Sequence, residues 1–258
     1  MKPAKLLLSI IAIASAVLLA GGAASAQTSF AAPKEHGANF HVTAGGVLMR
    51  AGGFNNHVIS NFVDSPTTPI MLNIRGDAMS MYGASVTFGW RIDRHNKIQM
   101  EASVVGGRQE VWLPFSPSPY GQPPYGQPIK TDYTMGMDLF TYDFCVPFGR
   151  KGICEFHLAP SVGAAYIYSN SIKQSCYTSV SPVRVQSSGV KNFTYAAGVG
   201  AGLTFHVTKR VQLDLCYRYL RMGKIDHKWS VSDSSHIEFE YSQTLAPHSV
   251  TFSAGWKF

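Results

Sequence analysis

Residues 192–207 read NFTYAAGVGAGLTFHV, and apolar side chains occupy every second position of this stretch. Small or polar residues (asparagine, threonine, alanine, glycine and histidine) fill the positions between them. Because successive side chains of a β-strand point to opposite faces, the pattern predicts a strand with one apolar face and one small or polar face. The same alternation returns in residues 211–219 and in residues 250–258.

Five earlier segments carry a less regular form of this pattern, and we predict a strand in each of them. They lie near residues 40–49, 82–92, 98–104, 133–146 and 156–168. Asp138 interrupts the alternation in the fourth of these segments. The sequence therefore predicts eight strands in all.

Connections of two lengths alternate between the predicted strands. Three are short, near residues 93–97, 147–152 and 208–210, and four are long, near residues 50–77, 114–131, 169–190 and 221–243. This alternation is typical of bacterial outer-membrane barrels, which have short periplasmic turns and long extracellular loops. A soluble β-sandwich explains the side-chain pattern equally well but does not predict the two loop lengths. We therefore predict an all-β fold, an eight-stranded antiparallel transmembrane β-barrel of the outer-membrane type.

The composition agrees with a surface that does not wholly face water. Charged residues make up 14% and apolar residues 45% of the 258 residues, and the mean hydropathy is +0.01. Soluble domains carry roughly 25% charged residues. This composition excludes a disordered or collagen-like chain. Beyond the N-terminal region, no stretch supplies the ~20 consecutive apolar residues of a transmembrane helix.

The N-terminal residues predict export. Lys2 and Lys5 precede an apolar segment, residues 6–20, and Ala24-Ser25-Ala26 matches a small-residue cleavage site. We expect a signal peptide over residues 1–26, a short periplasmic segment over residues 27–38 and the barrel over residues 39–258. The expected location is the cell outer membrane, after cleavage near Ala26. Export separates the chain from cytoplasmic nucleic acid, and its basic residues are scattered, so we expect no nucleic-acid partner.

Aromatic residues gather near both ends of the predicted strands. Those near the short turns are Trp90, Phe144, Phe148, Phe205, Trp256 and Phe258. Those near the long connections are Tyr82, Tyr166, Tyr168, Tyr195, Tyr217 and Tyr219. Amphipathic rings collect at the two interfaces of a membrane, so the grouping supports a barrel in a bilayer.

The last part of the chain resembles a known family. The segments FTYAAGVGAGL, from Phe193, and LDLCYRY, ending at Tyr219, look like the penultimate hairpin of opacity-type outer-membrane proteins of Gram-negative bacteria. SAGWKF, residues 253–258, looks like their closing strand. The resemblance implies that Trp256 and Phe258 form a signal read by the outer-membrane assembly machinery. Because the family comprises surface antigens, adhesins and envelope-stabilising proteins, it implies a fold and a location rather than one activity.

Charged residues recur on the polar faces of the predicted strands. In an eight-stranded barrel these faces point into a lumen that side chains fill. We interpret the charges as a lumen network of pairs, because an unpaired charge away from water costs several kcal/mol. If Ile92 pairs with Ile98, Arg91 lies within reach of Glu101. A proton or ion path is the alternative interpretation. The residues are Arg91, Glu101, Asp143, Glu155, His157, His206, Asp214, Arg218 and Lys257.

Two sets of residues in the long connections are candidate binding groups. The pentad PYGQP occurs twice, in residues 119–123 and 124–128. It displays Tyr120 and Tyr125 as candidate anchors for a host surface ligand, although a tolerated low-complexity insertion is the favoured explanation of the repeat. The second set lies at the height expected for lipopolysaccharide phosphates, which suit Arg and Lys. Its members are Arg221, Lys224 and Lys228.

The four cysteines offer one candidate disulfide. Cys145 and Cys154 flank a short turn. If Phe144 and Phe156 both face lipid, the two cysteine side chains point to opposite faces and cannot be joined without a bulge in the strand. We expect Cys216 in the lumen and Cys176 in a long loop. No spacing of cysteine and histidine suggests zinc, and we expect no metal or other cofactor.

These observations predict a non-enzymatic, envelope-structural and surface-exposed protein that is adhesive or binds lipopolysaccharide through its loops. Its expected partners are outer-membrane lipids, lipopolysaccharide, the assembly machinery and a host surface ligand. A small-solute channel is the second interpretation and an outer-leaflet lipid-modifying enzyme the third. Against the enzyme, the neighbours His248 and Ser249 point to opposite faces of a strand, and the pair His236 and Glu238 lacks a nucleophile.

Overall fold

The computed structural model describes residues 39–61, 69–112, 128–149, 153–177, 182–232 and 236–258. The expected signal peptide, the expected periplasmic segment, Tyr120 and Tyr125 lie outside the described residues. Within these ranges the regular elements are β-strands. The same ranges contain no helix with the length and apolar character to cross a membrane.

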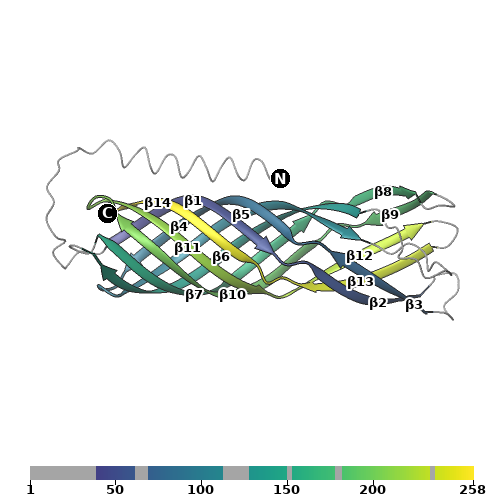
Figure 1. Ribbon diagram of the computed structural model, residues 1–258, viewed down its shortest axis with the longest axis horizontal. Coiled ribbons are helices and arrows are strands. Elements are labelled where there is room, and N and C mark those ends of the chain that lie inside the picture. The colour runs from purple at the N-terminus through teal and green to yellow at the C-terminus, as the bar shows by residue number, and fades with distance from the viewer. Residues whose placement is uncertain (1–38, 62–68, 113–127, 150–152, 178–181, 233–235) are drawn as a thin grey trace.

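Eight long antiparallel strands form a closed barrel (Figure 1). They are β1 (Asn39–Ala51), β4 (Met79–Arg91), β5 (Asn96–Trp112), β6 (Pro128–Phe148), β7 (Cys154–Ser169), β10 (Lys191–His206), β11 (Val211–Met222) and β14 (His248–Lys257). Neighbours follow the order β5-β4-β1-β14-β11-β10-β7-β6, and β6 pairs with β5 to close the ring. The predicted barrel and its eight strands are therefore confirmed.

Three hairpins extend the barrel at the end opposite the C-terminus (Figure 1). They are β2 (Phe54–Asn61) with β3 (Pro69–Gly76), β8 (Ile172–Tyr177) with β9 (Pro182–Ser187), and β12 (Lys224–Ser232) with β13 (His236–Thr244). β3 also pairs with the end of β5, and β9 pairs with β12. The long connections predicted for this end of the barrel are confirmed, and in these three much of the chain forms strands.

The outward-facing side chains of β12 are charged, so this strand lacks the apolar outer face of the barrel strands. In β12 the buried side chains are Ile225, His227 and Trp229, whereas the side chains between them are exposed and charged. The outer face of β12 meets water rather than lipid, so its alternation is inverted relative to the barrel.

The outer face of the barrel is apolar and carries two aromatic bands. Near the short turns the exposed rings include Phe40, Trp90, Phe144, Phe148, Phe205 and Phe258. Toward the hairpin end they include Tyr82, Tyr166, Phe193, Tyr195, Tyr217 and Tyr219. Exposed aliphatic side chains such as Leu48, Val162 and Val199 lie between the bands. Apart from Asp138 of β6, the face between the bands is apolar. An apolar wall of this kind is stable only in lipid, so the protein crosses the outer membrane with its strands.

The interior of the barrel is layered. Charged and polar side chains fill the half near the short turns, including Lys97, Asp143 and Glu155. An apolar layer follows toward the hairpins. Six of its buried members are methionines, namely Met49, Met79, Met81, Met135, Met137 and Met222. Flexible thioether side chains fill irregular space well, so this layer packs as an apolar plug.

Candidate functional site

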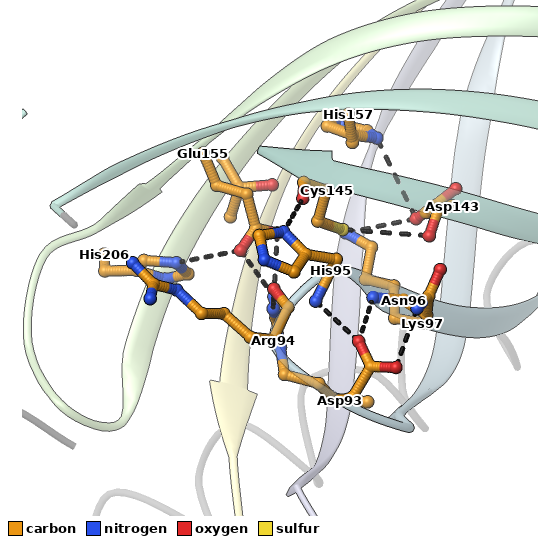
Figure 2. Close-up of polar contacts among 12 residues, drawn as sticks. Asp93, Arg94, His95, Asn96, Lys97, Asp143, Cys145, Glu155, His157 and His206 are labelled. Atoms are coloured by element: carbon orange, nitrogen blue, oxygen red, sulfur yellow. Dashed lines mark hydrogen bonds and ion pairs between the residues drawn. The ribbon is translucent and has the colours of Figure 1, made fainter. Parts of the chain in front are cut away.

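The lumen network begins close to the short turns (Figure 2). Arg91, at the end of β4, places one guanidinium nitrogen 2.7 Å from both carboxylate oxygens of Glu155 on β7. His206 Nε2 lies 3.8 Å from the same carboxylate, and Lys257 Nζ lies 2.9 Å from His206 Nδ1. Strands far apart in the sequence are therefore joined across the lumen by charge-assisted contacts.

The middle of the network is centred on His157 of β7. Its Nε2 atom lies 3.2 Å from Asp214 Oδ1, and its Nδ1 atom lies 3.8 Å from Asp143 Oδ2. Lys97 Nζ lies 3.1 Å from the same Asp143 oxygen. The Thr204 hydroxyl donates a hydrogen bond of 2.6 Å to Asp214. The imidazole is thus held between two carboxylates by neighbours on several strands.

The pair farthest from the short turns joins Arg218 on β11 to Glu101 on β5, with 2.9 Å between Arg218 Nη1 and Glu101 Oε2. The predicted pairing of Arg91 with Glu101 is therefore wrong. Arg91 lies opposite Lys97 in the β4–β5 ladder and binds Glu155 instead. For Arg91 and Glu101, the partner is the side chain met across the barrel and not a neighbour in the β4–β5 hairpin.

All nine predicted network residues point inward and contact at least one other member or a lumen residue. Two residues outside the predicted network, Lys97 and His41, are also buried in this region. The alternation of the next strand, extended by one residue, predicts an inward Lys97, because Lys97 shares a face with Gln99 and Glu101. The predicted turn over residues 93–97 includes Lys97, whereas β5 begins at Asn96.

Glycines on β10 make room for the bulky members of the network. A Cβ at Gly202 would collide with the His157 ring. Arg218 is the ladder partner of Gly200. A Cβ at Gly200 would lie 3.4 Å from Arg218 Cβ and 3.3 Å from Cys216 Sγ. The small residues of the 192–207 stretch therefore allow large polar side chains to fill the lumen from the neighbouring strands.

A cavity of about 20 Å³ lies inside the network, lined among others by Lys97, Glu101, Asp143, His157 and Arg218. A single water molecule needs roughly 10–15 Å³ of such space, so the cavity is of water size. Four carboxylates of the network, Glu101, Asp143, Glu155 and Asp214, are equal in number to four of its cations, Arg91, Lys97, Arg218 and Lys257. The arrangement can hold an ordered polar cluster, but it is far too small for a solute.

The extracellular extension closes over the methionine layer with an aromatic collar. His227 stacks on Tyr241, with 4.6 Å between ring centroids and 11° between planes, and meets Tyr133 edge-on at 6.1 Å. Burial lowers the pKa of His227 to about 4 and raises that of Tyr241 well above its ordinary value. Both groups are therefore neutral at pH 7. The collar adds an uncharged, packed layer above the network.

The outer wall beyond the tyrosine band carries exposed cations of two kinds. Four of those whose side chains the structure describes form ion pairs: Arg75 with Asp77, Arg108 with Asp132, Lys130 with Glu110 and Lys228 with Glu240. Four others form no ion pair with any described side chain: Arg50, Lys191, Arg221 and Lys224. Of the predicted lipopolysaccharide contacts, Arg221 and Lys224 thus remain available, whereas Lys228 Nζ lies 3.7 Å from Glu240.

The cysteines and the candidate enzyme residues form no reactive arrangement in the described parts of the chain. Cys145, Cys154 and Cys216 are free thiols, and Cys145 and Cys216 are buried. His248 is exposed on the outer wall and Ser249 is buried in the lumen, so the two side chains lie on opposite faces as expected. The side chains of Cys176, His236 and Glu238 lie outside the described ones. The described residues hold no cluster of three metal-ligating groups.

Comparisons with known proteins find only likenesses at low sequence identity. No family model and no curated protein matches the chain. OprG from Pseudomonas aeruginosa, an outer-membrane protein, is 10% identical over 86% of this chain and 96% of its own, with a TM-score of 0.49. Neisserial surface protein A is 15% identical over 84% and 95%, with a TM-score of 0.43. Ail of Yersinia pestis is 13% identical over 86% and 100%, with a TM-score of 0.40. These likenesses assign no activity.

Proposed function

We propose that the protein is a non-enzymatic, envelope-structural barrel that exposes its extension at the cell surface and binds lipopolysaccharide through its outer wall. The filled lumen is the observation that carries this proposal. Paired charges, the methionine layer and the aromatic collar follow one another along the axis. A protein that fills its interior in this way offers its outer surface, and not a pore, for interaction.

The outer wall supports binding to an anionic leaflet. Arg221 and Lys224 are exposed on the strands that continue outward from Tyr217 and Tyr219. Neither forms an ion pair with a described side chain, so their charges are available to phosphate groups at the outer interface. Opacity-type kinship, suggested by residues 190–258, and adhesion through Tyr120 and Tyr125 remain predictions of the sequence.

The first prediction concerns lipid. The full-length barrel, refolded in phosphatidylcholine bilayers, should unfold at a higher temperature when lipopolysaccharide is added, because a ligand that binds only the folded state stabilises it. Phosphatidylglycerol at equal charge serves as the control and should raise the midpoint less. Equal midpoints with lipopolysaccharide and with phosphatidylcholine alone would contradict lipopolysaccharide binding.

Lipid chemistry distinguishes a lipid-modifying enzyme from the proposed structural protein. A lipid-modifying barrel needs a nucleophile or a base at the outer rim, and His248 does not face Ser249. Lipid A extracted from cells with and without the protein should have the same mass. A mass difference that disappears with His248→Gln would favour the enzyme over the structural protein.

A further inference from the structure

The unpaired cations of the outer wall are not spread evenly around the barrel. Arg50 lies on β1, Arg221 at the end of β11 and Lys191 at the start of β10. β14 lies between β1 and β11, and β10 follows β11, so these four strands are consecutive in the ring. The wall formed by these strands therefore carries an uncompensated positive charge.

The wall formed by β5 and β6 is different. Its exposed cations Arg108 and Lys130 each have an acidic partner, at 2.7 Å in Asp132 and 3.5 Å in Glu110. Asp138 of β6 is a further exposed acid on this wall and lies below these pairs, between the two aromatic bands. An anionic lipid is therefore attracted to the wall formed by β1, β14, β11 and β10, and not to the wall formed by β5 and β6.

Three groups on the positive wall come together at one place. Arg50 of β1 is the ladder partner of His248 of β14, and His248 is the ladder partner of Tyr219 of β11. All three side chains are exposed on the outer face. Arg221 follows two residues after Tyr219 on the same face. Directly opposed side chains have Cβ atoms roughly 5 Å apart and diagonal ones roughly 7–8 Å, so long side chains from these positions reach a common point.

The tyrosine band holds His248 in place. The Tyr217 hydroxyl forms a hydrogen bond with His248 Nδ1. The Tyr217 and Tyr219 rings lie 5.9 Å and 5.1 Å from the imidazole, measured between centroids. This contact uses Nδ1 and leaves Nε2 for another partner. An exposed histidine fixed in this way is an oriented hydrogen-bonding group rather than a mobile one.

We propose that Arg50, His248 and Arg221 form a binding site for a phosphate group carried by an outer-leaflet lipid, which makes lipopolysaccharide attachment one-sided. The inference rests on the proposed function and names its ligand group. Two guanidinium groups supply planar, bidentate donors, and the imidazole supplies a third contact between them. The site lies at the edge of the apolar wall, with Leu48 and Tyr82 one outward-facing step below Arg50 and its partner Ser80. Acyl chains of the same lipid would therefore lie against the strands below.

The test uses the full-length barrel refolded in phosphatidylcholine nanodiscs. Bisphosphorylated lipid A, dephosphorylated lipid A and inorganic phosphate are the three probes, and bound lipid is measured by native mass spectrometry and by titration. The triple variant Arg50→Gln, His248→Gln and Arg221→Gln should lose ~tenfold or more in affinity for bisphosphorylated lipid A. The matched control, Arg108→Gln with Lys130→Gln, changes two exposed cations of the opposite wall and should stay within about twofold of the wild type. Gel mobility before and after boiling checks that each variant is folded.

The outcomes separate the inference from the function on which it rests. Loss in the triple variant with retention in the control supports the site. Equal affinity in wild type and triple variant, with clear binding by both, overturns the site and leaves lipopolysaccharide binding standing. Equal binding of dephosphorylated lipid A overturns the phosphate assignment. Inorganic phosphate binding as tightly as lipid A overturns the assignment to a lipid. Absence of lipid A binding by the wild type overturns the proposed function as well.

Discussion

Replacing Arg218 with alanine should destabilise the barrel by about 3–5 kcal/mol, the range found when one partner of a buried ion pair is removed. Arg218 is 5% exposed and Glu101 is 7% exposed. Their 2.9 Å contact joins β11 to β5 across the lumen. Without the guanidinium the carboxylate stays in the lumen without its partner. Urea unfolding in lipid vesicles, followed by tryptophan fluorescence, measures the change.

Two controls distinguish the loss of this buried ion pair from the loss of any ion pair. Arg108→Ala breaks an exposed pair with Asp132 and should cost less than about 1 kcal/mol. The double variant Glu101→Leu with Arg218→Met removes both charges and should be closer to the wild type than Arg218→Ala alone, because no unpaired charge is left. Equal destabilisation by Arg218→Ala and Arg108→Ala would show that the lumen pair has no special role.

Deleting Trp256 to Phe258 should abolish the folded barrel altogether. Trp256 pairs with Val42 of β1 on one side and with Val211 of β11 on the other. Lys257 donates a backbone hydrogen bond of 2.7 Å to Arg210, and Phe258 donates one of 2.9 Å to Phe40. The truncation removes these ladder bonds at the point where the first and last strands meet, and lipid offers no replacement partner.

The truncated chain should be degraded in the periplasm and should show no heat-dependent shift on gels. Immunoblots of the outer-membrane fraction, run with and without boiling, measure both effects. The conservative variant Phe258→Tyr keeps an aromatic ring and the backbone bond, so it should assemble at a near-normal level. A normal amount of heat-shifted truncated protein would contradict the closing role of these residues.

The strands of the barrel were predictable because each alternates between lipid and lumen. The stretch from Phe193 to Phe205 places apolar side chains outward and small residues inward along one strand. The extension was not predictable in this way. In β12 the outer face meets water instead of lipid, and the inner face is apolar or aromatic instead of charged. His227 is buried and its neighbour Lys228 is exposed, an inverted pattern that resembles an ordinary polar loop in the sequence.

The lumen partners were not predictable, because alternation identifies the face of a residue but not what lies across the barrel. Ile98 pairs with Trp90 and not with Ile92, since residues 92–95 form a longer turn. Asp93 shapes that turn by accepting hydrogen bonds from the backbone of His95 and from Asn96, and these bonds lower its pKa. The partner of Glu101 is 117 residues away, on a strand that no hairpin joins to β5.

Single-channel recording in planar bilayers tests the filled lumen most directly. The wild-type barrel should give no steady, porin-like current, because the charge network, the methionine layer and the aromatic collar lie in series. Asp214→Ala should lower stability without opening a current. A reproducible open-channel current in the wild type, with an ion selectivity that changes in Asp214→Ala or Arg218→Ala, would contradict the structural function and establish a channel.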